Sequence, residues 1–198
     1  MRLVVIDLEM NQPSGKIIQI GAVVVNIRSG KIENGYVVLV DPGELISDEI
    51  ANLTGITNER IQNGGVMPDV AFAAFWKWFE EKKVGGNIAA WGSDVWVLKE
   101  ASKAAGVKYP AKLHNMDIKA VSQVFRSALP NGTKNRGGLK NTLHAFDLPF
   151  EGREHDAFDD ARNTALLLCH FQEIVFKSLT AKTLFSEWKR IIPYKSIT

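Results

Sequence analysis

Two carboxylates lie two positions apart at the end of an apolar segment near the start of the chain. Residues 4–10 read VVIDLEM, so Asp7 and Glu9 follow β-branched residues typical of a buried strand. Side chains at positions i and i+2 of a strand lie on the same face, so both carboxylates would project together. Two like charges on an apolar strand repel each other and are costly to desolvate, and a divalent metal ion would compensate them. A strand end at which both carboxylates face water is an equally good interpretation of this segment alone.

A second group of acids lies in residues 155–161, which read HDAFDDA. Acids are favoured in the first turn of a helix by the helix dipole, and Asp156 fits an N-cap or first-turn position. Asp160 differs, because it shares a helical face with the apolar residues Leu167 and Phe171, which should face the sheet. The pattern therefore predicts that Asp160 is an inward-facing carboxylate that needs a partner.

Asp94 and His155 also lie at the ends of predicted elements. Residues 87–91 (NIAAW) are typical of a short apolar strand, and Asp94 follows at the junction with a helix. The ordinary role of an aspartate at such a junction is an N-cap. His155 precedes the last long helix, so it can approach a site from outside a metal centre. The remaining histidines have no comparable acidic group around them, and we assign structural or surface roles to His114, His144 and His170.

Asp7, Glu9, Asp94 and Asp160 together predict a site for two divalent metal ions. Ligation by oxygen alone favours Mg²⁺ or Mn²⁺ over Zn²⁺. Four carboxylates suffice to hold two ions about 3.5–4 Å apart, the arrangement used for in-line phosphoryl displacement. One ion would activate an attacking water, and the other would stabilise the leaving 3′ oxygen. Imidazole titrates near neutral pH, so His155 is suited to accept the proton of that water.

The elements that must position these residues indicate an α/β fold with a mixed sheet. β-prone segments with short connections predict an antiparallel meander formed by residues 4–10, 17–27 and 35–40, followed by short strands at 87–91 and 114–118. Amphipathic segments predict helices, the longest at residues 69–83 and from just after His155 to about Leu179. Aromatic residues recur at helical spacing in the first of these, and we expect core packing rather than a nucleotide platform for Phe72, Phe75, Trp76 and Phe79.

Composition restricts the class of protein. With 198 residues, 45% of them hydrophobic and 23% charged, the chain is typical of one soluble globular domain. The net charge of +2 neither requires nor excludes a nucleic-acid partner. Cys169 is the single cysteine, which excludes a disulfide framework and favours a reducing, cytoplasmic setting. No apolar run reaches the roughly 20 residues of a membrane helix, and we expect neither a signal sequence nor a membrane partner.

The motifs resemble those of the DEDDh 3′–5′ exonucleases, the DnaQ-like family with an RNase H-like fold. The three family motifs occur in order, as Asp7-Leu8-Glu9, as Asp94 in Trp91-Gly92-Ser93-Asp94, and as His155 with Asp160. Residues 53–56 (LTGI) resemble a link that the family carries between the first two motifs. The resemblance extends over about residues 3–175. It implies a mixed five-stranded sheet, in which an antiparallel meander is joined by parallel strands and flanked by helices.

Two details resemble the Eri-type and KapD-like branch of this family, whose members trim 3′ ends of structured RNA. They are the Trp91-Gly92 pair before Asp94 and residues 150–155 (FEGREH). Residues 7–10 (DLEM) also resemble oligoribonucleases, but those carry tyrosine in place of His155.

The resemblance also implies contacts with substrate. The backbone near Met10 would receive the terminal 3′-hydroxyl and sugar, and Leu53 would pack on the last base. Trp91, from the second motif, is a further candidate for substrate binding. Three basic residues are candidates for phosphate contacts, although a solvated surface role is the commoner outcome for such residues: Lys134, Arg136 and Lys140.

We therefore expect a metal-dependent 3′–5′ exonuclease that releases nucleoside 5′-monophosphates from single-stranded 3′ ends of RNA or DNA, using two Mg²⁺ or Mn²⁺ ions. The exonuclease domain is predicted at residues 1–179, and residues 180–198 are predicted to form a tail that packs on the domain or on a partner. Two alternatives stay open: a catalytically silent nucleic-acid-binding or regulatory module, and a polymerase-associated DNA proofreading exonuclease. A homodimer is compatible with the sequence.

Overall fold

A five-stranded mixed sheet organises the computed structural model, which describes residues 1–127, 129 and 137–180. The strand order is β3-β2-β1-β4-β5. The strands are β1 (Arg2–Met10), β2 (Ile17–Asn26), β3 (Lys31–Leu39), β4 (Asn87–Ala90) and β5 (His114–Asp117). The predicted α/β class is confirmed, and so is the meander of three antiparallel strands joined by two parallel ones.

Strand β1 is central and contributes to both faces of the sheet. It pairs antiparallel with β2 and parallel with β4. Because side chains alternate along a strand, Val4 and Ile6 enter the core on one face, while Leu3 and Val5 enter the core on the other.

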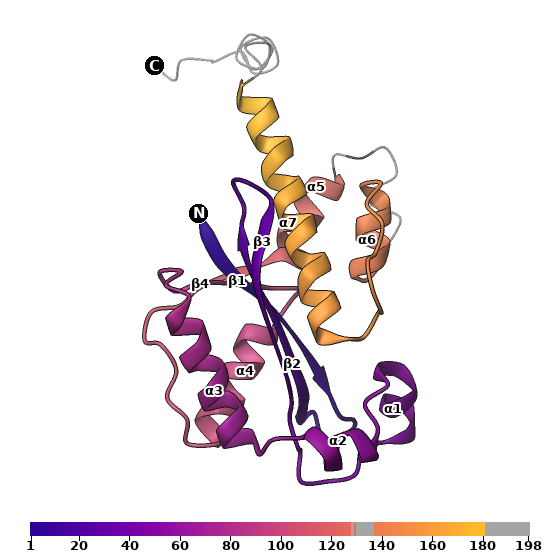
Figure 1. The fold of residues 1–198 in the computed structure, drawn as a ribbon. Helices are drawn as coiled ribbons and strands as arrows, with labels where there is room; N and C mark the ends of the chain where they lie inside the picture. The colour runs from indigo at the N-terminus through magenta and orange to yellow at the C-terminus, as the bar shows by residue number, and fades with distance from the viewer. Residues whose placement is uncertain (128, 130–136, 181–198) are drawn as a thin grey trace, which may run out of the picture.

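Helices cover both faces of the sheet (Figure 1). On one face, α3 (Pro68–Glu81) and α4 (Asp94–Ala104) pack on the β1 side chains Val4 and Ile6. The aromatic residues of α3 lie in this core, as predicted: Phe72, Phe75, Trp76 and Phe79 are all buried.

On the opposite face, α7 (Ala157–Thr180) runs along β1 and β2, with α5 (Ile118–Ser127) and α6 (Leu139–Ala145) beside it (Figure 1). Phe171 of α7 stacks on Phe125 of α5, with ring centroids 4.3 Å apart. This packing fixes the helix whose first turn carries Asp160.

Two short helices, α1 (Asp48–Thr54) and α2 (Asn58–Gly64), lie at the end of the sheet where β1 finishes (Figure 1). The side chains of Ser47 and Thr57 accept hydrogen bonds from the backbone of the first turns of α1 and α2. A small apolar cluster joins both helices to the start of β2: Ile18, Ile46, Ile50, Ile56 and Ile61.

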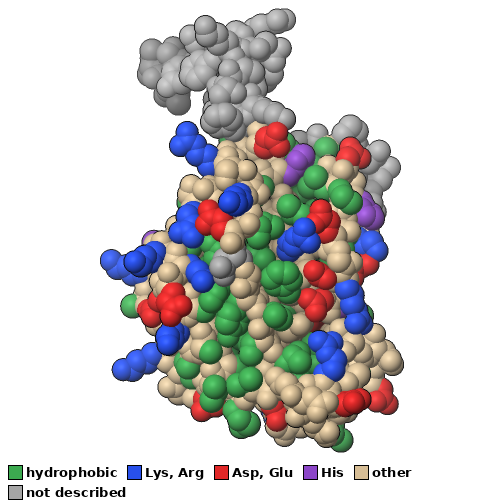
Figure 2. All heavy atoms as spheres, in the orientation of Figure 1, with side chains coloured by type: hydrophobic (Ala, Val, Ile, Leu, Met, Phe, Trp, Pro, Cys, Tyr) green, Lys and Arg blue, Asp and Glu red, His purple; other side chains and the backbone are tan. Residues whose placement is uncertain are grey.

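Several predictions fall outside the described residues, among them the phosphate contacts of Lys134 and Arg136 and nearly all of the tail at 180–198. Within the described part of the chain, no helix combines the length and apolarity needed to cross a bilayer. Basic and acidic side chains are interspersed on the face in Figure 2, with apolar side chains exposed between them.

Candidate active site

Asp7 and Glu9 lie on the face of β1 that α7 covers. Alternation along β1 places them on the side of Leu3 and Val5, which pack against α7. Glu9 is buried, with 8% of its surface exposed, and Asp7 is half-buried. The structure therefore brings both carboxylates to the covered end of the central strand.

Asp94 reaches the same place from α4. Ser93 occupies the N-cap position, and Asp94 is the first residue of the helix. Its carboxyl group hydrogen-bonds the side chain of Asp7 and accepts the backbone N–H of Leu8. Asp94 thus connects the start of α4 to β1 instead of capping its own helix.

The start of α7 is fixed on β2 by two residues that lie opposite the β1 acids. Glu9 pairs with Gln19 and Asp7 pairs with Gly21 in the β1–β2 ladder. Gln19 is buried, and its Oε1 accepts the N–H of Ala157 at 3.0 Å. A Cβ at Gly21 would lie 2.1 Å from the carbonyl carbon of Ala157, so only glycine allows this close approach.

Asp156 completes the start of α7. It accepts a hydrogen bond from Gln19 at 3.2 Å and from the N–H groups of Phe158 and Asp159 at 3.1 and 3.2 Å. The predicted N-terminal role of Asp156 is confirmed by these contacts. Asp160 then follows in the first turn, and its charge acts on Asp7 and Glu9.

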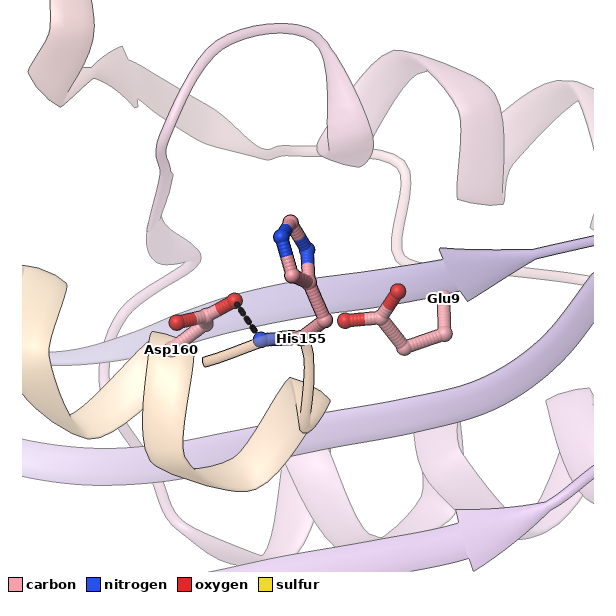
Figure 3. Close-up of side chains that lie close together, drawn as sticks. All are labelled: Glu9, His155 and Asp160. Carbon is pink, nitrogen blue, oxygen red and sulfur yellow. Dashed lines mark hydrogen bonds between the residues drawn. The ribbon is translucent and has the colours of Figure 1, made fainter. Parts of the chain in front are cut away.

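The loop of residues 152–155, called here the histidine loop, is tied to the same helical turn. Asp159 Oδ2 accepts the N–H of Arg153 at 2.8 Å, and Asp160 Oδ2 accepts the N–H of His155 at 3.2 Å. His155 has a left-handed φ of 60°, which is uncommon for a residue with a side chain. Figure 3 shows its imidazole between Asp160 and Glu9. A ring nitrogen of His155 and carboxylate oxygens of Glu9 and Asp160 all lie within 4.8 Å of one another.

We call Asp7, Glu9, Asp94 and Asp160 the carboxylate cluster. Burial raises the pKa of Glu9 to about 8, helped by the charges of nearby aspartates and opposed by Arg153. Burial also raises the pKa of Asp160 to about 7 and that of Asp94 to about 6. The pKa of Asp7 is raised well above its ordinary value by burial and by the neighbouring acids. Without a cation, these four groups cannot all be ionised near neutral pH.

This donor set fits divalent metal ions. Its ligand atoms are carboxylate oxygens, which suit hard cations, and the ions would supply the positive charge that the cluster otherwise lacks. Glu9 and Asp160 are close enough to share one ion. A ring nitrogen of His155 lies within 4.8 Å of both carboxylates, so it can accept a proton from a water held there.

The candidate substrate residues have different surroundings. Leu53 is 45% exposed at the end of α1, where its carbonyl accepts a hydrogen bond from Arg153 in the histidine loop. Met10 is half-buried against the core under α3 and α4, and Trp91 packs on the core under α7. Lys140 forms an ion pair with Glu154 of the histidine loop.

The sequence motifs do not predict three residues that position the elements of the site. Gln19 and Gly21 interrupt an apolar strand, and a polar residue or a glycine in such a strand is a signal of a special contact. Buried Asn11 follows β1, and its Oδ1 accepts the N–H of Ser47 at 3.0 Å, which joins the end of β1 to the start of α1.

The exonuclease family model, of the RNase T type, matches residues 4–168, and the chain belongs to this family. ERI1 exoribonuclease 2 of Xenopus laevis is 27% identical over 196 residues, which cover 83% of this chain and 27% of that protein. The 3'-5' exonuclease Snipper of Drosophila melanogaster is 27% identical over 205 residues, which cover 92% of this chain and 67% of that protein. The chain thus spans about a quarter of the length of the ERI1 exoribonuclease 2 proteins that it matches (27% for the frog protein).

Solved structures share the fold. The nuclease domain of 3'hExo, a DEDDh family member bound to rAMP, has a TM-score of 0.68 at 21% identity, covering 87% of this chain and 92% of that one. Cell-death related nuclease 4 has a TM-score of 0.73 at 20% identity, covering 87% of this chain and 64% of that one. The predicted RNase H-like fold and the resemblance to Eri-type DEDDh exonucleases are confirmed.

Proposed function

We propose that this protein is a metal-dependent 3′–5′ exonuclease that hydrolyses the last phosphodiester bond of a single-stranded 3′ end. The observation that carries the proposal is that ligand atoms of Glu9, Asp160 and His155 lie within 4.8 Å of one another, while Asp7, on the same face of β1 as Glu9, is hydrogen-bonded to Asp94. Membership in the exonuclease family supports the same activity. The catalytic domain is proposed to extend over residues 1–179.

The carboxylate cluster is proposed to hold two divalent ions, Mg²⁺ or Mn²⁺. When bound, such ions lower the pKa of a ligated water and stabilise the negative charge that develops on the phosphoryl group and the leaving oxygen. Asp7 is the carboxylate whose loss should disturb both ions, because it is hydrogen-bonded to Asp94 and the charges of Glu9 and Asp160 act on it.

His155 is proposed to act as the general base. Its imidazole accepts a proton from the attacking water as the water oxygen bonds to phosphorus. The bond from phosphorus to the 3′ oxygen of the preceding nucleotide breaks, and the phosphate leaves with the terminal nucleoside as a 5′-monophosphate. The 3′ oxygen takes up a proton from solvent, so the shortened strand again ends in a 3′-hydroxyl. His155 is exposed, so its proton can pass to solvent before the next cycle. The hydrogen bond from its N–H to Asp160 fixes the backbone from which the imidazole projects.

RNA is proposed as the preferred substrate over DNA. The ERI1 exoribonuclease 2 relatives support this preference, as does a structure of a 3′-exonuclease in specific recognition of a histone mRNA stem-loop, with a TM-score of 0.68 at 20% identity. The exposed Leu53 is proposed to pack on the terminal base. The backbone near Met10 is proposed to receive the terminal 3′-hydroxyl and sugar, and Trp91 is a further proposed contact. The half-buried free thiol of Cys169 fits a cytoplasmic location.

End-labelled oligonucleotides test the proposal. RNA and DNA strands carrying a 5′ or a 3′ label are incubated with the purified protein in Mg²⁺, in Mn²⁺ or in EDTA. We expect labelled mononucleotide from the 3′-labelled strand, stepwise shortening of the 5′-labelled strand, and no cleavage in EDTA. Intact strands in both metals would contradict the proposal, and binding of these strands without cleavage would favour the silent binding module.

A further inference from the structure

Arg153 connects two segments that lie far apart in the sequence. Its backbone belongs to the histidine loop and donates to Asp159 at 2.8 Å. Its guanidinium group donates from Nη2 to the carbonyl oxygen of Leu53 at 3.4 Å, across 100 positions of sequence. The residue therefore joins the histidine loop to residues 53–56, the link segment in which α1 ends.

Gly55 leaves the space that the guanidinium group occupies. A Cβ at Gly55 would lie 2.0 Å from Nη1 and 2.7 Å from Cζ of Arg153. Gly55 also ends α1 with a φ of 68°, a conformation that glycine adopts without strain. The same glycine thus terminates the helix and leaves room for the Arg153 side chain, which indicates that the local fold is adapted to this contact.

The guanidinium group is held by this link rather than by an acidic partner. Among the residues that the structure describes, none forms an ion pair with Arg153, and its one side-chain hydrogen bond goes to Leu53. Its positive charge still acts on Glu9 in the carboxylate cluster. Arg153 therefore contacts the backbone of the residue that carries the exposed Leu53 side chain, and it lies two residues before His155 in the chain.

On the basis of the proposed function, we propose that Arg153 is a positioning residue that couples binding of the terminal base at Leu53 to the placement of His155. A base packed on Leu53 restrains residues 53–56, and Arg153 transmits that restraint to the histidine loop. Without the guanidinium group, the base still packs on Leu53, but His155 is no longer held by the occupied link. Terminal-base recognition would then contribute to binding and lose its effect on the rate of bond cleavage.

The test compares two substrates with two proteins under single-turnover conditions in Mn²⁺. The substrates are RNA oligonucleotides that end in an ordinary nucleotide or in an abasic one. We expect the wild type to cleave the ordinary end faster, by on the order of tenfold, because the occupied link aligns His155. Arg153→Ala should lose a similar factor on the ordinary end and change less than about twofold on the abasic end. An equal loss on both substrates would refute the coupling.

Three further variants separate coupling from a general structural effect. Arg60→Ala removes another arginine that binds the same link, through the carbonyl of Gly55, without touching the histidine loop, and it should keep the wild-type preference for an ordinary end. Gly55→Ala should displace the guanidinium group and reproduce the substrate ratio of Arg153→Ala, with an additional loss of thermal stability because alanine is strained at a φ of 68°. The double variant, Arg153→Ala with Gly55→Ala, should show the same ratio of cleavage rates on ordinary and abasic ends as Arg153→Ala alone. A further decrease of this ratio in the double variant would refute the coupling.

Failure of the coupling and failure of the proposed function give different results. A wild type that cleaves neither substrate in Mn²⁺ refutes the proposed function and the coupling with it. A wild type that cleaves both, together with an Arg153→Ala protein that keeps the full preference for an ordinary end, refutes the coupling alone. Thermal unfolding of each variant, measured in parallel, shows that the compared proteins are folded.

Discussion

The side chain of Gln19 donates a hydrogen bond of 3.2 Å to Asp156, which lies 137 positions later in the chain. Gln19 is also the β2 partner of Glu9, and it accepts the N–H of Ala157 where α7 begins. The helix that carries Asp160 therefore starts at a fixed position beside the strand that carries Glu9. The geometry of the carboxylate cluster depends on a buried amide that is not itself a candidate ligand.

Replacing Gln19 by leucine should affect both stability and activity. Asp156 loses one partner, and the buried N–H of Ala157 loses its acceptor, so we expect the free energy of unfolding to fall by about 1–3 kcal/mol. The first turn of α7 also loses its anchor, which should slow cleavage by on the order of tenfold or more. Chemical denaturation and initial rates measure the two effects. Gln172→Leu, farther along α7, is the matched control, and an unaltered Gln19→Leu protein would contradict the anchoring role.

Gly21→Ala should be strongly destabilising, because the new Cβ would meet backbone atoms of Ala157 and Phe158 at 2.1–2.2 Å. Backbone cannot move aside as a flexible side chain can, so α7 must shift away from β2, at a cost of about 3 kcal/mol or more. Gly64→Ala is the control, since its nearest contact would be 4.0 Å away, and we expect it to be neutral or slightly stabilising. Equal unfolding midpoints for the two variants would show that α7 does not approach β2 so closely.

The metal-free protein should become less stable as the pH rises. Folding raises the pKa of Asp94 to about 6, of Asp160 to about 7 and of Glu9 to about 8, so the folded state binds more protons than the unfolded chain. The stability linked to these protons is complete below the unfolded pKa values and is lost as the pH rises through the folded ones. In EDTA, the free energy of unfolding should therefore fall between about pH 5 and pH 9.

Two comparisons check this interpretation of the pH profile. Mg²⁺ or Mn²⁺ should oppose the loss of stability, because the cations favour the ionised carboxylates and bind the folded state. Glu9→Gln should flatten the profile near pH 8, where Glu9 titrates in the folded state. A stability in EDTA that is constant or increasing over this range would contradict the raised pKa values.

Local patterns in the sequence predict the elements and the ends at which the candidate residues lie. The period of two along residues 4–10 places Asp7 and Glu9 on one face, and the strand-to-helix junction places Asp94 at the start of α4. The helical period likewise places Asp160 on the inward side of α7, where its charge acts on Asp7 and Glu9. These predictions need only a few neighbouring residues, so they agree with the structure.

Contacts between distant segments are not encoded in such patterns. Nothing local to Arg153 indicates that its side chain reaches Leu53, and nothing local to Gln19 indicates Asp156 as its partner. Both contacts depend on how α1 and α7 are placed around the sheet. Sequence motifs therefore predict the carboxylates, whereas the residues that hold them in place can be identified only from the tertiary structure.

His155→Gln should separate metal binding from catalysis. The variant keeps all four carboxylates, so Mn²⁺ should still raise its thermal stability, while the cleavage rate falls by about 10²–10⁴-fold through loss of the base. Asp160→Asn should lose both properties, because it removes a proposed ligand. His144→Gln, an exposed change on α6, is the control and should match the wild type. If the His155→Gln protein cleaves RNA at the wild-type rate, His155 is not the base.

The most direct measurement follows a 5′-labelled single-stranded RNA in Mn²⁺, with the wild type and Asp7→Asn compared side by side. Asp7 is hydrogen-bonded to Asp94, and the charges of Glu9 and Asp160 act on it, so its substitution removes the carboxylate that connects the other three. For the wild type, we predict a ladder that shortens from the 3′ end, with release of nucleoside 5′-monophosphates. For Asp7→Asn, we predict a cleavage rate lower by on the order of 10²-fold or more, as expected for loss of a catalytic group. An intact RNA with the wild type, or equal ladders for both proteins, would contradict a metal-dependent exonuclease centre at the end of β1.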